Sequence, residues 1–148
     1  MHQQSTSHLF MIEPVEFYSN EQTAYTNHYQ KTVLDEAADK ISEKALAEFH
    51  DLKNAIEKRG IKVTSLLGSS DCPDHVFPNW FITFDDKTMQ IFSMMAPNRR
   101  GEKKSHMIQY LSETYELTDD IPHLEEKEIF LESTSSMVFD RVNRIVYG

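Results

Sequence analysis

Apolar residues recur every three or four positions from Leu34 to Ile56, and this spacing predicts one long amphipathic helix. The apolar positions are Leu34, Ala38, Ile41, Ala45, Phe49, Leu52 and Ile56. Charged side chains occupy many of the positions between them, so we expect the opposite face of the helix to be exposed. Gly60 follows the last turn and is expected to end the helix.

Shorter runs predict strands on both sides of this helix. Residues 8–12 are apolar and are closed by Pro14, and residues 61–66 alternate and are rich in β-branched side chains. We interpret residues 16–31, which are rich in Asn, Tyr and Thr, as a loop. The N-terminal half is therefore expected to contain a strand, a helix and a second strand.

The C-terminal half carries a hairpin pattern, a helix pattern and late strand signals. Residues 76–84 and 88–94 predict two strands joined by a turn at 85–87. The remaining expectations are a helix over about 99–113, an acidic loop over 118–127, strand pieces over 130–132 and 137–139, and a last strand over 144–147. The whole pattern indicates a mixed α/β fold.

Length and composition narrow the class of protein. The length of 148 residues suits a single domain over 1–148, in which the polar residues 1–7 are expected to be disordered. The formal charge of −9 argues against a nucleic-acid partner, because phosphate binding needs a basic face. No apolar stretch is long enough to span a membrane, and we expect a cytoplasmic protein.

The chain has one cysteine, Cys72, which excludes an internal disulfide and a zinc site built from several thiolates. No residue pattern indicates a metal ion or an organic cofactor, so we expect neither.

Three clusters carry side chains suited to chemistry. Residues 72–81 place Asp74 and Asn79 at the entry to an expected strand. Asn98-Arg99-Arg100-Gly101-Glu102 places two guanidinium groups at the expected start of a helix, where they suit a carboxylate or a phosphate and oppose the helix dipole. Leu131-Glu132-Ser133-Thr134-Ser135-Ser136 places a carboxylate in a run of hydroxyl residues.

In this order, the three clusters resemble motifs of the arginine deiminase, dimethylargininase and amidinotransferase superfamily, and its bacterial amidinotransferase-like branch above all. The opening segment from Met11 to Phe17, with Asn20, Thr23 and Asn27, is similar to that branch as well. The resemblance implies a pentein-type fold, a five-bladed αβ propeller of ββαβ blades, of which the chain would form roughly half. It also implies action on guanidino groups through a cysteine, a histidine and a carboxylate.

The resemblance assigns roles to five residues. Glu132 matches the catalytic carboxylate, and Asp74 matches an acidic position that contacts the substrate. Asn79 occupies a polar position facing the substrate, and either Arg99 or Arg100 matches the arginine that pairs with a substrate carboxylate. The implied ligand is a small guanidino compound similar to arginine.

Two departures from the family pattern fall in the third cluster, where Ser133 and Ser135 stand in place of glycines. If these positions need a positive φ or a close backbone approach, serine is expected to strain or reshape the loop.

Three hypotheses follow for the function. The first is the N-terminal half of a guanidine-modifying enzyme, inactive alone because nothing in its 148 residues matches the family's catalytic cysteine and histidine motifs. The second is a non-catalytic binding or oligomerisation module derived from that family. The third is an unrelated enzyme that uses Glu132, Asp74 and His75. Because sheet edges are expected to lack partners, we predict a homo-oligomer or a second polypeptide that supplies the missing half.

Overall fold

The computed structural model describes residues 4–28 and 38–148. Contacts divide the chain into two compact units. One unit runs from Thr6 to Phe77, and the other runs from Pro78 to Gly148 and includes Gln4 and Ser5. We refer to them as the 6–77 unit and the 78–148 unit, and each is described by itself.

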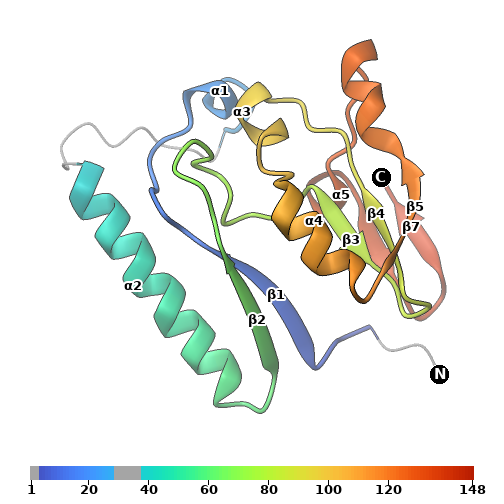
Figure 1. The fold of residues 1–148 in the computed structure, drawn as a ribbon, viewed down its shortest axis with the longest axis horizontal. Helices are drawn as coiled ribbons and strands as arrows, with labels where there is room; N and C mark the ends of the chain where they lie inside the picture. The colour runs from blue at the N-terminus through green and yellow to red at the C-terminus, as the bar shows by residue number, and fades with distance from the viewer. Residues whose placement is uncertain (1–3, 29–37) are drawn as a thin grey trace. The chain divides into compact units, whose positions relative to one another are not determined.

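The 6–77 unit is a strand–helix–strand arrangement (Figure 1). Its elements are β1 (His8–Glu13), α1 (Glu21–Ala24), α2 (Ala38–Glu57) and β2 (Lys62–Leu67). β1 and β2 pair in parallel, from His8 opposite Lys62 to Glu13 opposite Leu67. Parallel neighbours need a long crossover, and the connection between the two strands contains α2.

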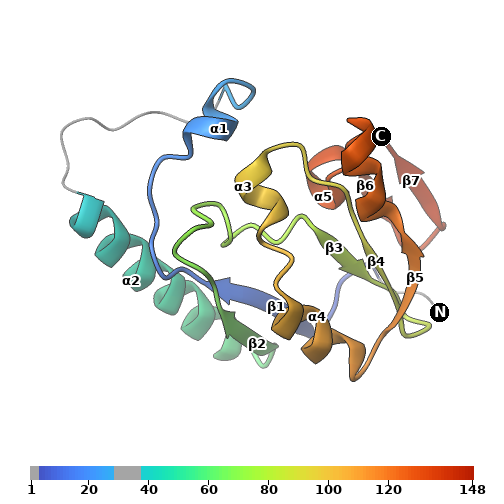
Figure 2. The ribbon, with the colours of Figure 1, turned by 45° about the horizontal axis from the view of Figure 1, so that its top comes forward.

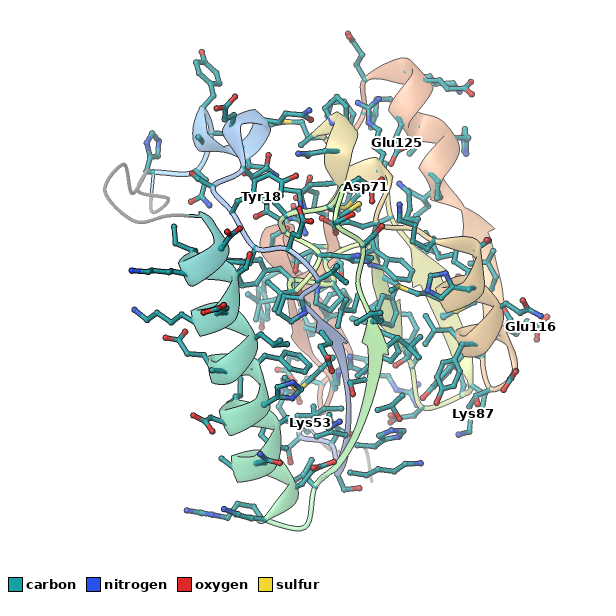
Figure 3. All side chains as sticks on the ribbon, turned by 60° about the vertical axis from the view of Figure 1, so that its left-hand side comes forward. Tyr18, Lys53, Asp71, Lys87, Glu116 and Glu125 are labelled. Carbon is teal, nitrogen blue, oxygen red and sulfur yellow. The ribbon has the colours of Figure 1, made fainter. Side chains whose placement is uncertain are left out.

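The helix α2 confirms the predicted helix over the residues described, but Leu52, one of its apolar positions, is 55% exposed. Phe49 is buried, and Lys53, labelled in Figure 3, donates from Nζ to Ser65 Oγ on β2 at 2.8 Å. Beyond the helix, Gly60 takes φ +80°, which glycine adopts without strain, and its N–H bonds to Glu57 O. The expected first turn around Leu34 lies outside the described residues.

The 78–148 unit contains a ββαβ arrangement followed by a hairpin. Its first elements are β3 (Phe81–Thr83), β4 (Thr88–Ile91), α3 (Pro97–Arg100), α4 (Ser105–Ser112) and β5 (Glu116–Asp120). The strand order is β3-β4-β5, with β3 antiparallel and β5 parallel to β4. In both ribbon views α4 lies beside this sheet (Figure 1, Figure 2), and it buries Met107 and Leu111.

The rest of the 78–148 unit consists of short elements. They are the 3₁₀ helix η1 (Ile121–Lys127), α5 (Ser133–Ser136), β6 (Val138–Asp140) and β7 (Ile145–Tyr147). β6 and β7 form an antiparallel hairpin, as the sequence predicts for residues 137–147. The fully buried side chains of this unit include Trp80, Met89, Met94 and Met107.

Five sequence expectations about local structure are wrong. Residues 76–80 are not strand, because 69–77 form successive turns and Pro78 cannot donate to a ladder. The expected loop over 16–31 contains the helical turn α1, although residues 29–31 lie outside the described part. The expected helix over 99–113 is divided into α3 and α4, with Gly101 at the end of α3.

The other two errors lie nearer the C-terminus. Residues 118–127 are not a loop, because β5 pairs with β4 and η1 follows it. Residues 130–132 are not strand, and a helical turn, α5, follows them. In both places the contact with a distant segment decides the conformation, which local patterns do not contain.

Candidate functional site

Glu132 lies immediately before α5, and its side chain is 21% exposed. Its Oε1 accepts a hydrogen bond from the Met95 N–H at 2.9 Å. Its Oε2 lies 3.4 Å from Ser135 Oγ and 3.7 Å from Arg99 Nη1. One carboxylate oxygen is thus fixed by the main chain, while the other has longer contacts, and the side chain as a whole is partly exposed.

The serines around this carboxylate differ in backbone conformation. Ser133 is fully buried and has φ +33°, in the region that favours glycine. Its Oγ donates to Phe81 O at 3.5 Å. Ser135 lies inside α5, and its Oγ donates to Glu132 O at 2.6 Å. The departure from glycine therefore carries backbone strain at Ser133, whereas Ser135 adds a hydrogen bond.

Arg99 is buried and already holds a carboxylate of the protein. Its Nε donates to Glu102 Oε1 at 2.8 Å and its Nη2 to Glu102 Oε2 at 3.2 Å. Glu102 itself is fully buried. This two-point pair satisfies both buried charges, and Nη1 of Arg99 then faces Glu132.

Arg100 binds main-chain carbonyls close to the Met95 N–H, which donates to Glu132. Its Nε donates to Met94 O and its Nη2 to Met95 O, each at 3.0 Å. Its guanidinium also lies over the Phe130 ring, 5.4 Å from the centroid. Both arginines lie in the last turn of α3, not at a helix start, so the expectation that they oppose the helix dipole is wrong.

Asn79 contacts the segment that follows Glu132, although the two lie far apart in the sequence. Its Oδ1 accepts a hydrogen bond at 3.3 Å from Oγ1 of Thr134, the second residue of α5. The 78–148 unit therefore connects Asn79, Arg99, Arg100 and Glu132 through the segments 93–95 and 130–136.

Asp74 belongs to the 6–77 unit and is held by side chains of that unit. Its Oδ2 accepts from Asn20 Nδ2 at 2.7 Å and from Thr23 Oγ1 at 3.1 Å. Asn20 is buried and also caps α1, since its Oδ1 accepts from the Gln22 N–H.

Other residues singled out in the sequence occupy interior positions. Cys72 is 1% exposed, and its thiol donates to Asp71 Oδ1 at 3.6 Å. His75 is 2% exposed. Neither side chain is placed to react with a molecule in solution. Among residues 4–28 and 38–148, no group of three or more His, Cys, Asp and Glu could hold a metal ion.

A cavity of about 490 Å³ lies at the tips of the β3–β4 and β6–β7 hairpins. It is lined by residues that include Phe84, Asp86, Phe139, Asp140 and Arg144, and by none of the five candidate residues. In the part of the chain that the structure describes, no helix is both long and apolar enough to cross a membrane.

Two groups that determine the environment of Glu132 were not predicted from the sequence. The Met95 amide is a main-chain donor, and no residue type signals such a role. Glu102 follows Arg99 by three residues, a spacing that places an ion pair on one helical face and could have been recognised.

Comparisons with known proteins agree on the fold and the family. The family model for eukaryotic N,N dimethylarginine dimethylhydrolase matches residues 13–148. The apo structure of ArgZ, an arginine dihydrolase from the ornithine-ammonia cycle in Cyanobacteria, covers 95% of this chain at 17% identity and a TM-score of 0.66. Unliganded AgrE covers 95% at 16% identity and a TM-score of 0.65. None of the curated proteins matches the chain.

The chain spans about a fifth of the length of these solved structures, namely 20% of ArgZ and 19% of AgrE. At such low identity the two likenesses support a common mixed α/β fold with small sheets, and they carry no argument about substrates.

Proposed function

The chain belongs to the N,N dimethylarginine dimethylhydrolase family, and on that premise we propose that it forms the carboxylate-bearing part of a site for a small guanidino compound. Glu132 is the carboxylate that receives the guanidinium group. Such a group presents several N–H donors in one plane, which a carboxylate matches better than any other side chain.

The environment of Glu132 carries this proposal. Its Oε1 is oriented by the Met95 amide, so the carboxylate does not have to be ordered by the ligand. Its Oε2 has only contacts of 3.4 and 3.7 Å to Ser135 and Arg99, which a ligand N–H at a shorter distance can replace or join. Partial exposure keeps the carboxylate accessible.

The other candidate residues have separate roles in the proposal. Asn79, which bonds to Thr134 two residues after Glu132, offers its amide to the substrate. Arg100 offers the remaining edge of its guanidinium to a substrate carboxylate, and Arg99 holds Glu132 and Glu102 in place. For Asp74, which belongs to the 6–77 unit, contact with a substrate's amino end or guanidinium is a separate proposal that rests on the family resemblance alone.

We propose further that the chain binds without turnover. Family chemistry on guanidino carbon requires a thiolate nucleophile, and the one cysteine in these 148 residues is the buried Cys72. The ββαβ arrangement of β3, β4, α3–α4 and β5 is proposed as one blade of a partial αβ propeller.

Ligand binding by the isolated chain tests the proposal. Isothermal titration with L-arginine, a methylated arginine and agmatine should give binding, whereas L-citrulline should not bind. Citrulline has nearly the shape of arginine but carries a neutral urea, so it is the matched ligand for the charge that Glu132 recognises. Equal affinities for arginine and citrulline would contradict the proposal.

Turnover forms the second arm of this experiment. Release of ammonia or citrulline from arginine should stay at background with the isolated chain. Robust turnover would contradict the absence of a working nucleophile.

A second function, self-association, is favoured by the β6–β7 hairpin. Val138, Val146 and Tyr147 are all more than half exposed, at 68%, 52% and 55%. A two-stranded hairpin is marginal alone and gains stability by adding strands. We expect a homodimer by light scattering, and a monomeric mass at all concentrations would contradict this.

A further inference from the structure

The segment Ser93–Met95, between β4 and α3, has no strand partner in the sheet and is held by other segments instead. Leu131 donates its N–H to Ser93 Oγ at 3.0 Å. Arg100 donates to the carbonyls of Met94 and Met95. The Met95 N–H donates to Glu132. The position of the Glu132 carboxylate therefore depends on where this segment is held.

Glu125 holds the adjacent amide of the same segment. Its Oε1 accepts from the Met94 N–H at 2.7 Å, one peptide before the amide that donates to Glu132. Glu125, labelled in Figure 3, belongs to η1, and its carboxylate binds the segment that follows β4. Two carboxylates thus accept from neighbouring amides of one short segment.

Lys103 supplies the positive charge beside Glu125, and both side chains are largely buried. Its ammonium group forms an ion pair with Glu125 Oε1 and lies 3.4 Å from Phe92 O. The two side chains are only 11% and 14% exposed. A carboxylate at this depth has lost much of its hydration, and the ion pair with Lys103 compensates for that loss and holds the side chain in place.

We propose that Glu125 and Lys103 are positioning residues for Glu132: they fix the Met94 peptide, and through it the Met95 amide that aims the Glu132 carboxylate. This inference rests on the proposed guanidino site for its functional meaning. Its structural content can be tested without any ligand. Neither residue touches Glu132, so their effect must pass through the segment Ser93–Met95.

The first test is amide hydrogen exchange of the full 148-residue chain, observed at Met95. Glu125→Gln keeps the shape of the side chain but removes the charge that strengthens its hydrogen bond and pairs with Lys103. We expect Met95 exchange to be about tenfold faster, because the bond from the Met94 N–H that anchors the segment changes from a charge-assisted to a neutral hydrogen bond. Glu126→Gln removes the same charge from the exposed neighbouring residue and should leave the rate unchanged.

Variants of Lys103, the ion-pair partner of Glu125, test whether the effect of Glu125→Gln comes from the ion pair and not from a local folding defect. Lys103→Met should also accelerate exchange at Met95, and Lys103→Arg should restore the slow rate by restoring the cation. Amides of α2 in the 6–77 unit serve as an internal reference. Equal Met95 rates in the Glu125→Gln, Glu126→Gln and wild-type proteins would overturn the proposal.

The second test is a double-mutant cycle on L-arginine affinity. If Glu125 acts through Glu132, Glu125→Gln weakens binding about five- to tenfold in the wild type and has no further effect in a Glu132→Gln background. Equal losses in both backgrounds would overturn the positioning role. If the wild-type chain binds no guanidino ligand, the proposed function fails, while the exchange experiment still decides the positioning claim.

Discussion

Asp74 and Glu132 are two partly buried carboxylates, one in each unit, and they are held by different means. Asp74 accepts from the side chains of Asn20 and Thr23, which both belong to the turn around α1. Glu132 accepts from a main-chain amide more than thirty residues earlier in the chain and faces the guanidinium of Arg99.

This difference shows two ways of preparing an anionic site. Side-chain donors can be replaced one at a time at moderate cost, because each contributes one hydrogen bond. A main-chain donor is the same for every residue except proline, so substitution of its side chain does not remove it. Its position depends on the buried charges that hold the segment in place. Arg99 with Glu102 and Lys103 with Glu125 are such braces. Substitutions should therefore affect the two units unequally.

Arg99→Ala should produce the largest loss of stability. It leaves Glu102 buried without its two-point partner, which typically costs about 3–5 kcal/mol. Urea unfolding followed by the fluorescence of the single tryptophan, Trp80, which lies in the same unit, measures this loss. The double variant Arg99→Met with Glu102→Leu removes both charges and should recover most of the stability. A loss below ~1 kcal/mol in Arg99→Ala would contradict the role of this pair as a brace.

Asp74→Ala should cost less, about 1–2 kcal/mol, because it removes acceptors from two side-chain hydrogen bonds. Thermal unfolding followed by circular dichroism is the measurement. Glu16→Ala, a change at an exposed carboxylate of the same unit, is the comparison. If Asp74→Ala were as damaging as Arg99→Ala, the contrast between the two units would fail.

Ser133→Gly should stabilise the chain by about 0.5–1 kcal/mol, because glycine adopts φ +33° without strain. Ser135→Gly should destabilise it by a similar amount, since it removes the hydrogen bond to Glu132 O and places glycine within α5. Unfolding midpoints in urea distinguish the two signs. Destabilisation by Ser133→Gly would contradict the strain assigned to the backbone at Ser133.

The smallest effect is expected at Asp140, whose carboxylate holds only its own turn. Hydrogen bonds from the Asn143 side chain and N–H lower the pKa of Asp140 below its ordinary value. A lowered folded-state pKa means that the stabilisation is present above the ordinary aspartate pKa, about 3.9, and is lost as the pH falls through the lower folded value.

Stability measured between about pH 5 and pH 3 should therefore fall slightly less steeply in Asp140→Asn than in the wild type. Identical slopes would contradict the assignment of this contribution to the Asn143 bonds.

Sequence reasoning succeeded where a pattern is local. The periodicity from Ile41 to Ile56 predicted α2, and the strand signals over 137–139 and 144–147 predicted the strands of the β6–β7 hairpin. It failed where a distant partner decides the structure, as for β5, which pairs with β4 although its own residues are mostly acidic or polar. The order of the motifs predicted Glu132 and the two arginines as site residues. It did not predict that both arginines already bind groups of the protein.

The same limit hid the Glu125–Lys103 pair. Glu125 lies in a segment that looks like a solvated acidic loop, and Lys103 lies in a short basic cluster. Nothing in either local pattern connects two residues that are twenty-two positions apart. Only the fold brings the two side chains together, where Glu125 accepts from the Met94 N–H.

The affinity of the Glu132→Gln variant for L-arginine tests the central claim most directly. Glutamine retains the size of the side chain but loses the charge that the guanidinium is proposed to meet, while Glu128→Gln makes the same change at an exposed residue nearby. We predict that Glu132→Gln weakens arginine binding at least tenfold, or about 1.4 kcal/mol, and that Glu128→Gln leaves it unchanged. Equal affinities of the two variants would contradict the assignment of Glu132 as the guanidinium-binding carboxylate.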